Sequence, residues 1–354
     1  MKNKSKLIGF TCAYTPLALI EAAGYVPFRV LPMGEPPDQA GSLLHDNLCP
    51  HVKRILDLAF AGDIPDMAGM VFINSCDAMR RLADAWERVR PNDPVIRMEL
   101  PTTVDDNSVS YLGGEIAALA NTLSGMNGRP VDQERIRAAI ARYAELSAML
   151  EKLKSLINSG VLRGGSPRIQ KLYNRASTEP IGQLLRELSR MISDEPKHVA
   201  SAGDSVPVLL FGNVLPDPEA FSLFESCGAL IVDDDFCTGS RLFSSAGQSM
   251  DETEDIFVQL AKAILSQPPC ARTFDPDHPG KIARDILSRA SACGARGVIG
   301  HTLKFCDPYL ARLPAVRDTF RDAGFPLLLL EGDCTLRSIG QQRTRIEAFI
   351  EMMR

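Results

Sequence analysis

The sequence has little excess charge of either sign and no long apolar run. Its 39 Lys and Arg against 44 Asp and Glu give a formal net charge of -5 at pH 7. Such a chain offers no basic face for the phosphate backbone of a nucleic acid. No run approaches the roughly 18 apolar residues that span a bilayer, and the start of the chain lacks the apolar core of a signal peptide. We therefore expect a cytoplasmic protein with no nucleic-acid or membrane partner.

Three common motifs are also absent. No GxGxxG follows a strand-like segment and no GxxxxGK[ST] occurs, so nothing indicates dinucleotide binding or a Walker-type phosphate loop. The absence of CxxC argues against zinc ribbons and bacterial ferredoxin-type sites. The chain nevertheless has nine cysteines, an odd number. Because disulfide frameworks belong to small secreted domains, metal-binding thiolates and plain core cysteines are the two remaining interpretations.

Strand-like and helix-like segments alternate along both halves of the chain. This alternation, with 354 residues of which 45% are hydrophobic, predicts an α/β protein of two parallel-sheet (Rossmann/flavodoxin-like) domains with a helical connecting region. The N-terminal domain is expected over 1–195, with a long helical segment at about 105–195, and the C-terminal domain over 205–354. The boundary is placed in or near the polar stretch 194–205.

The expected elements follow from apolar periodicity and from Gly and Pro signals. Strands are predicted at 7–11, 26–30, 67–73, 94–99, 206–211, 229–233, 297–300 and 326–330. Helices are predicted at 16–23, 48–61, 78–89, 218–226, 252–265, 281–292, 308–323 and 341–353. The helical segment from 106 to about 193 is expected to break at 128–130 and 160–167.

Cysteines lie at several predicted strand ends and first helical turns. Cys227 and Cys293 lie instead in amphipathic helical segments and are expected to be packing residues. Thiolates at loops and helix N-termini suit iron-sulfur clusters or zinc, because these soft metals bind deprotonated sulfur. On spacing alone, unreactive buried thiols stay as the alternative. The cysteines in loops or first turns are Cys12, Cys49, Cys76, Cys237, Cys270 and Cys306.

Polar neighbours of these cysteines are weaker candidates. His51 and His45 flank Cys49, and a lone histidine is more often structural than functional. Asp77 and Asp307 each follow a cysteine, where helix N-capping is the ordinary role and tuning of a metal centre the functional one.

Six segments occur in an order that matches a known family: GFTCAYTPLALIEAAGYVPFRV, DNLCPHVKRILDLAFAG, GMVFINSCDAMRRLADAW, DDDFCTGSRLF, GVIGHTLKFCDPYLARLPAVRDTFRDAGFPLLLLEGDCT and GQQRTRIEAFIEMM. On these segments the chain resembles the 2-hydroxyacyl-CoA dehydratases, including the D-component of 2-hydroxyglutaryl-CoA dehydratase, the benzoyl-CoA reductases and their double-cubane-cluster relatives. The part from about 105 to 200 matches mainly in length and helical character. Departures from the family pattern are Ala18, where glutamate is usual, and Cys334, where tyrosine is common.

The resemblance implies an iron-sulfur cofactor. Family members hold a 4Fe-4S cluster by three cysteines and leave one iron open, and the matching positions here are Cys49, Cys76 and Cys306. The double-cubane relatives bind two linked cubanes through six cysteines. The candidates for a second cluster are Cys12, Cys237 and Cys270. The cofactor could therefore be one 4Fe-4S cluster or a double-cubane cluster.

The resemblance also implies an anaerobic enzyme, a lyase (dehydratase) or an oxidoreductase. We expect an iron-sulfur subunit that forms a ketyl radical on a CoA-thioester substrate, with low-potential electrons from an ATP-dependent activator protein, in a homodimer or a heterodimer with a homologous subunit. The FCDP sequence around Cys306 favours this interpretation as a dehydratase or reductase subunit. Cys270 favours the alternative, a stand-alone homodimeric double-cubane reductase of small molecules. A non-catalytic iron-sulfur carrier is the third possibility.

Overall fold

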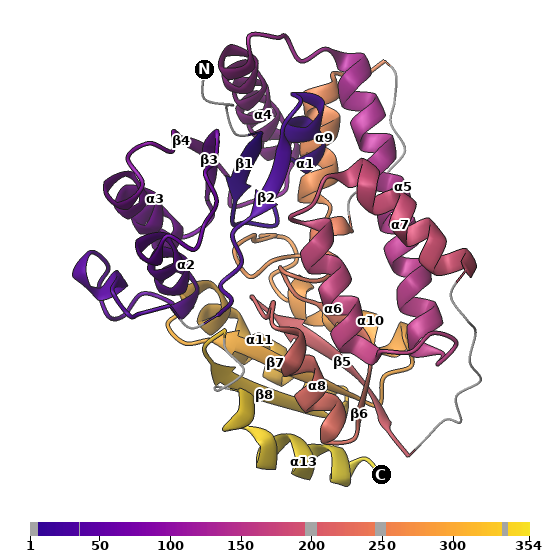
Figure 1. The fold of residues 1–354 in the computed structure, drawn as a ribbon. Coiled ribbons are helices and arrows are strands. Elements are labelled where there is room, and N and C mark those ends of the chain that lie inside the picture. Colours follow the sequence, from indigo (N-terminus) through magenta and orange to yellow (C-terminus); the bar gives the residue numbers. More distant parts are fainter. Residues whose placement is uncertain (1–5, 35, 195–203, 245–252, 335–338) are drawn as a thin grey trace.

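Two parallel sheets with surrounding helices make up the protein (Figure 1). The computed structural model describes residues 6–34, 36–194, 204–244, 253–334 and 339–354. Each sheet has four strands, which confirms the predicted α/β class. The expected domain boundary falls largely outside the described ranges and stays a prediction. Within those ranges, no helix is long and apolar enough to cross a membrane.

The first sheet has the strand order β2-β1-β3-β4. Helices α2 and α3 cover one face, where Phe72 and Trp86 meet edge to face in a buried cluster. Helix α1 and the helical segment that follows the sheet share the core on the other face. The elements of this part are β1 (Leu7–Phe10), α1 (Leu17–Ala22), β2 (Val26–Arg29), η1 (Ala40–Ser42), α2 (Pro50–Ala61), β3 (Gly69–Asn74), α3 (Asp77–Val89) and β4 (Val95–Glu99).

Four helices connect the sheets: α4 (Asp106–Asn127), α5 (Gln133–Asn158), α6 (Gly165–Ala176) and α7 (Ile181–Asp194). The break between α6 and α7 was not among the predicted ones. It lies just before Pro180, and proline restricts the residue that precedes it to extended conformations. Helix α6 begins inside the expected break at 160–167. Helix α9 (Ile256–Leu265), from the second half, returns to pack on α4 in the core of the first half.

The second sheet repeats the same order, as β6-β5-β7-β8. The expected strand 297–300 is too short, because β7 pairs with β8 as far as Leu303. The expected helix start at 252 lies outside the described residues, and α9 begins only at Ile256, where the Asp255 side chain caps it. The elements are β5 (Val206–Gly212), α8 (Pro218–Ser226), β6 (Ala229–Asp235), η2 (Ser240–Phe243), α10 (Lys281–Ala292), β7 (Gly297–Leu303), α11 (Asp307–Asp322), β8 (Leu327–Gly332) and α13 (Arg343–Met352).

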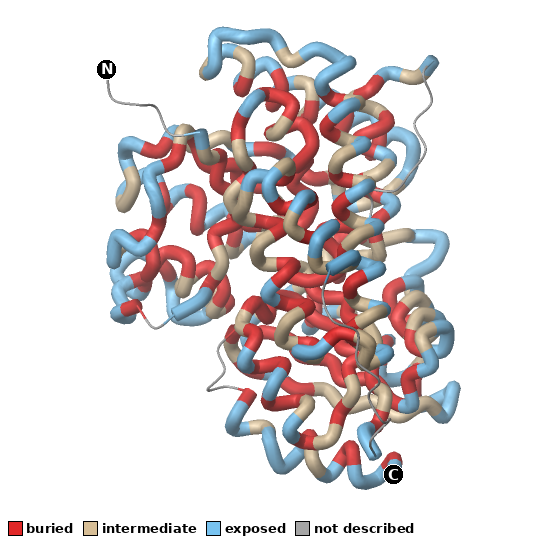
Figure 2. The backbone as a smooth tube through the Cα atoms, turned by 45° about the vertical axis from the view of Figure 1, so that its right-hand side comes forward, coloured by how far each residue is buried: buried red, intermediate tan, exposed pale blue. Residues whose placement is uncertain are grey.

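The strand order fixes where a ligand would bind. In each sheet the chain turns to opposite sides after its first strand, and open α/β sheets bind ligands at the carboxyl ends beside such a switch point. Strands β5 and β7 approach so closely there that a Cβ on Gly212 would lie 1.8 Å from the carbonyl oxygen of His301. Buried backbone runs through the interior of both halves, and exposed stretches follow the outside (Figure 2).

Candidate functional site

One cavity of about 100 Å³ lies where loops from the carboxyl ends of both sheets meet. Its walls come from the turns after β1, β3, β5 and β7, together with segments near 49, 237 and 270. The structure therefore brings every loop cysteine singled out in the sequence into one place. The cysteines that line the cavity are Cys12, Cys49, Cys76, Cys237, Cys270 and Cys306.

Three of these thiols, the helix-capping triad of Cys49, Cys76 and Cys306, are the N-cap residues of α2, α3 and α11. Proline directly after Cys49, and one position further on after Cys306, starts a helix readily because the first turn needs no proline N–H. Three helix N-termini therefore place partial positive charge beside one site. The expected N-capping role of Asp77 and Asp307 was wrong, since each is the first residue inside its helix.

Burial dominates the pKa values of this triad. It raises the pKa of Cys49 to about 12 and that of Cys306 to about 11. The pKa of Cys76 is also raised by burial. Backbone N–H groups at the helix starts oppose the shift, although none makes a full hydrogen bond to a capping sulfur. Ionisation of Cys76 or Cys306 would raise the pKa of Cys49 further, because the three thiols line the same cavity.

The other three thiols form the loop triad, Cys12, Cys237 and Cys270, which follow β1, β6 and α9. The neighbouring Cys270 thiol and the positive charges of Arg241 and Arg29 lower the pKa of Cys237. Burial raises the pKa of Cys12 to about 11. Cys237 and Cys306, one from each triad, pack against the same small apolar cluster. The two triads are therefore neighbours within one cavity.

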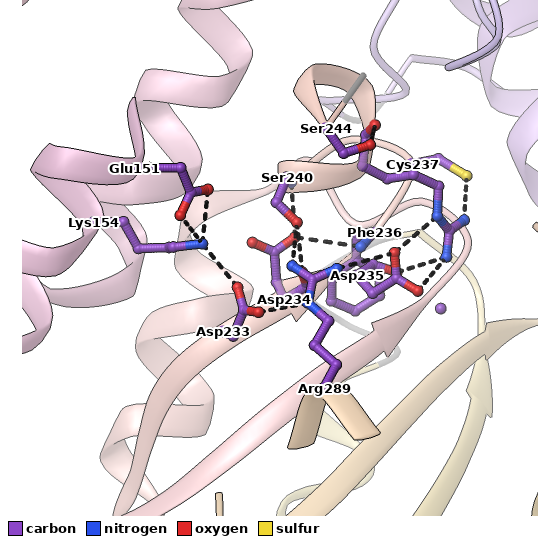
Figure 3. A network of polar contacts seen from close by, with 12 residues as sticks. Glu151, Lys154, Asp233, Asp234, Asp235, Phe236, Cys237, Ser240, Ser244 and Arg289 are labelled. Atoms are coloured by element: carbon purple, nitrogen blue, oxygen red, sulfur yellow. Dashed lines mark hydrogen bonds and ion pairs between the residues drawn. The ribbon is translucent and has the colours of Figure 1, made fainter. Parts of the chain in front are cut away.

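A buried ionic network fixes the turn that carries Cys237 (Figure 3). Arg241 is 1% exposed and its Nη2 lies 2.8 Å from Asp235 Oδ2. The same guanidinium donates from Nη1 to the Cys237 sulfur at 3.2 Å. Asp233 binds both Lys154 at 2.8 Å and Arg289. Arg241 therefore makes an ion pair and also contacts a thiol.

The amide of Asn213 orients Cys306 from the neighbouring strand end. Its Nδ2 donates to the Cys306 sulfur at 2.9 Å, while its Oδ1 accepts from the Leu303 N–H at 3.1 Å. The Tyr309 hydroxyl donates to the Gly212 carbonyl at 2.8 Å. These bonds hold the β5 and β7 ends together behind the cavity.

The cavity wall contains cations but no carboxylate among the residues described. Arg29, Arg241 and Arg272 line it, and so does His51. Both ring nitrogens of His51 are buried without a partner in the described part of the chain. Burial, with the charge of Arg29, lowers the pKa of His51 to about 3, so this imidazole is neutral. Such a wall fits an anionic group.

The described residues contain no group of three His, Cys, Asp or Glu placed to hold one metal ion. Thiolates that bind a cluster attach to different irons and therefore stand further apart. The donor set is sulfur throughout, the kind that iron-sulfur clusters take.

Several residues of the wall were not predicted from the sequence. Arg29 could have been noticed in the sequence, because it is a charged residue within the apolar strand predicted at 26–30. No sequence pattern indicated that the wall would include Asn213, Met79 and Tyr309. The other cysteines lie outside the wall: Cys227 and Cys293 end helices α8 and α10 and pack in the core, as expected, and Cys334 is buried next to Cys237 and Cys306.

Comparison with protein families gives a match over residues 12–353 to the model described as 2-hydroxyglutaryl-CoA dehydratase, D-component. The chain is 24% identical to the (R)-phenyllactyl-CoA dehydratase beta subunit of Clostridium sporogenes, over 98% of this chain and 92% of that one. It is also 24% identical to one of the benzoyl-CoA reductase subunits of Thauera aromatica, over 91% and 84%.

The (R)-2-hydroxyglutaryl-CoA dehydratase subunit beta of Acidaminococcus fermentans is 23% identical, over 98% of this chain and 92% of that one. A solved structure, described as a complex of SsGBP and GDP, aligns over 97% of this chain and 99% of that one, at 13% identity. Its TM-score of 0.22 is too low to inform the fold or the site.

Proposed function

Because the chain belongs to the 2-hydroxyglutaryl-CoA dehydratase D-component family, a family of lyases and oxidoreductases, we propose that it is an iron-sulfur enzyme with two linked 4Fe-4S clusters in its cysteine cavity. The observation that carries the proposal is the lining of one cavity by six cysteines from both halves of the chain. A single cluster on three cysteines would leave the loop triad without a role. In this proposal the helix-capping triad holds one cluster and the loop triad holds the other.

The wall fits such a group chemically. Six thiolates and the cluster sulfides bring negative charge, and the wall offers three arginines, three helix N-termini and no described carboxylate to meet it. Donors such as Asn213 Nδ2 and Arg241 Nη1 already point at sulfur. Hydrogen bonds to sulfur and the exclusion of water are two means by which a protein sets a cluster's potential.

The groups of this chain have distinct tasks in the proposed reaction. When bound, the clusters supply single electrons at low potential. The neutral His51 ring, with no partner of its own among the described residues, offers one donor and one acceptor to a small substrate in the cavity. The buried side chains of Tyr14 and Met79 limit the entry of water. We propose a reductase of small molecules that works as a homodimer and receives electrons from an ATP-dependent activator protein.

Iron and acid-labile sulfide in anaerobically purified protein test the proposal. We expect about eight irons per chain, since each cubane holds about four. A value near four would refute the paired site. Absence of both elements after anaerobic reconstitution would refute the iron-sulfur function as a whole.

A second candidate rests on the relatives. Proteins with 23–24% identity over most of this chain are named as subunits of CoA-thioester dehydratases and of benzoyl-CoA reductase. We propose, as the alternative, a subunit with one cluster on the helix-capping triad that acts on a CoA thioester beside a homologous subunit. Native mass and turnover distinguish the candidates. A chain active with a 2-hydroxyacyl-CoA only in the presence of a second subunit favours this alternative, whereas a homodimer active without CoA favours the first.

A further inference from the structure

Arg29 is a buried cation that has no carboxylate partner among the residues that the structure describes. It lies at the end of β2 and is 2% exposed. Its Nη2 donates to the Thr11 carbonyl at 3.1 Å, and its Nη1 donates to the Cys237 carbonyl. Its Nε has no partner in the described part of the chain. The ionisable groups that would act on its charge, once deprotonated, are the thiols of Cys237 and Cys12.

A lone guanidinium in this position is costly. An arginine stays protonated under any condition in which a protein folds, and a buried charge requires an opposite charge nearby. Backbone carbonyls supply only partial charge. The carbonyls that Arg29 binds belong to Thr11, which precedes Cys12, and to Cys237 itself. Arg29 is therefore built into the two turns that present the loop triad.

The other buried arginine gives a comparison within the same cavity. Arg241 also touches the loop triad, but Asp235 at 2.8 Å neutralises it. Arg29 thus supplies the uncompensated formal charge beside Cys12 and Cys237. The helix-capping triad receives mainly the partial charges of helix N-termini, with Arg272 as a nearby cation that acts on Cys76. The electrostatic surroundings of the two triads are therefore different.

We propose that Arg29 is a positioning residue that raises the reduction potential of the cluster held by the loop triad above that of the cluster held by the helix-capping triad. These two clusters are called the loop half and the helix-capping half of the cofactor. This inference rests on the function proposed above. A fixed positive charge favours the state with one more electron, because reduction adds negative charge. On one-electron reduction by a low-potential donor, the donor is oxidised and the loop half gains the electron, with no bond made or broken. The loop triad would then hold the half that accepts the first electron, and the helix-capping triad would hold the half of lower potential.

Redox titration of iron-loaded protein tests this role. Wild type, Arg29→Gln and Arg29→Lys are prepared anaerobically, their iron is counted, and midpoint potentials are measured by electron paramagnetic resonance during titration with titanium(III) citrate. The resonance signal that disappears in a Cys270→Ser variant is assigned to the loop half. We expect Arg29→Gln to lower the potential of the loop half more than that of the other half, and Arg29→Lys to keep both near wild type.

Arg272→Gln is the matched control. Its side chain lines the same cavity but its charge acts on Cys76, so its loss should shift the helix-capping half instead. A loaded Arg29→Gln protein with unchanged potentials would overturn the role of Arg29. If Arg29→Gln takes up no iron, a normally loaded Arg29→Lys supports the need for charge, and failure of both overturns it in favour of a purely structural role. A wild type without iron and sulfide refutes the proposed function itself.

Discussion

Replacement of Cys270 by serine separates one cluster from two. Cys270 lies in the segment after α9, lines the cavity, and contributes most to the lowered pKa of Cys237. A serine keeps a hydroxyl donor but removes the sulfur ligand. A cubane held by two of three thiolates does not persist, because its binding energy depends on every anchor. Iron should fall from about eight to about four per chain.

The assay is the iron-to-chain ratio of anaerobic protein, with the visible spectrum recorded in parallel. Cys293→Ser is the matched control, because that thiol is also partly exposed but ends helix α10, where it donates to the Ala290 carbonyl at 3.4 Å. The control should keep its full iron content. A Cys270→Ser protein with unchanged iron would refute the assignment of a cluster to the loop triad.

Three further outcomes are expected. Serine at any position of the helix-capping triad should remove the broad absorption at roughly 400 nm that is typical of cubanes while the far-UV helical signal persists, and full iron content in all three variants would contradict the ligand assignment. In the metal-free chain, iodoacetamide should modify Cys237 first at pH 7, because its pKa is lowered and the thiolate is the reactive form, whereas burial raises the pKa of Cys12, Cys49 and Cys306. Equal labelling of all cavity thiols in peptide mass spectra would oppose this. Asp235→Asn leaves Arg241 buried without its ion-pair partner, and should lower the free energy of unfolding by roughly 3–5 kcal/mol in urea titration, whereas a loss below about 1 kcal/mol would show that Arg241 finds another anion.

The sequence predicts those parts of the site that follow local rules. Cys12 and Cys76 could be placed because each follows an apolar segment that reads as a strand, and the carboxyl ends of parallel strands share one edge. The convergence of Cys270 with them could not be derived from spacing. It follows α9 rather than a strand, and its position depends on the packing of that helix against α4.

Long-range contacts explain what the sequence conceals. Within the strand 26–30, Arg29 is visibly a charge among apolar residues, yet its hydrogen-bond acceptor on Cys237 is 208 positions away. The extra length of β7 has the same origin, because only pairing with β8 extends it to Leu303. Helix boundaries such as 281–292 depend on local periodicity and were predicted correctly.

Each triad takes cysteines from both halves of the chain, two from the first and one from the second in the helix-capping triad and the reverse in the loop triad. Each half supplies three of the six cavity cysteines, yet neither half alone completes either triad. Occupancy of the cavity also joins segments more than 200 residues apart in sequence, such as Cys76 and Cys306. Binding of a group in the cavity therefore also stabilises the association of the two halves of the chain. A chain that has lost this group in air would lose both its activity and this stabilisation. Separation of the two halves should then be visible as faster proteolysis between the sheets.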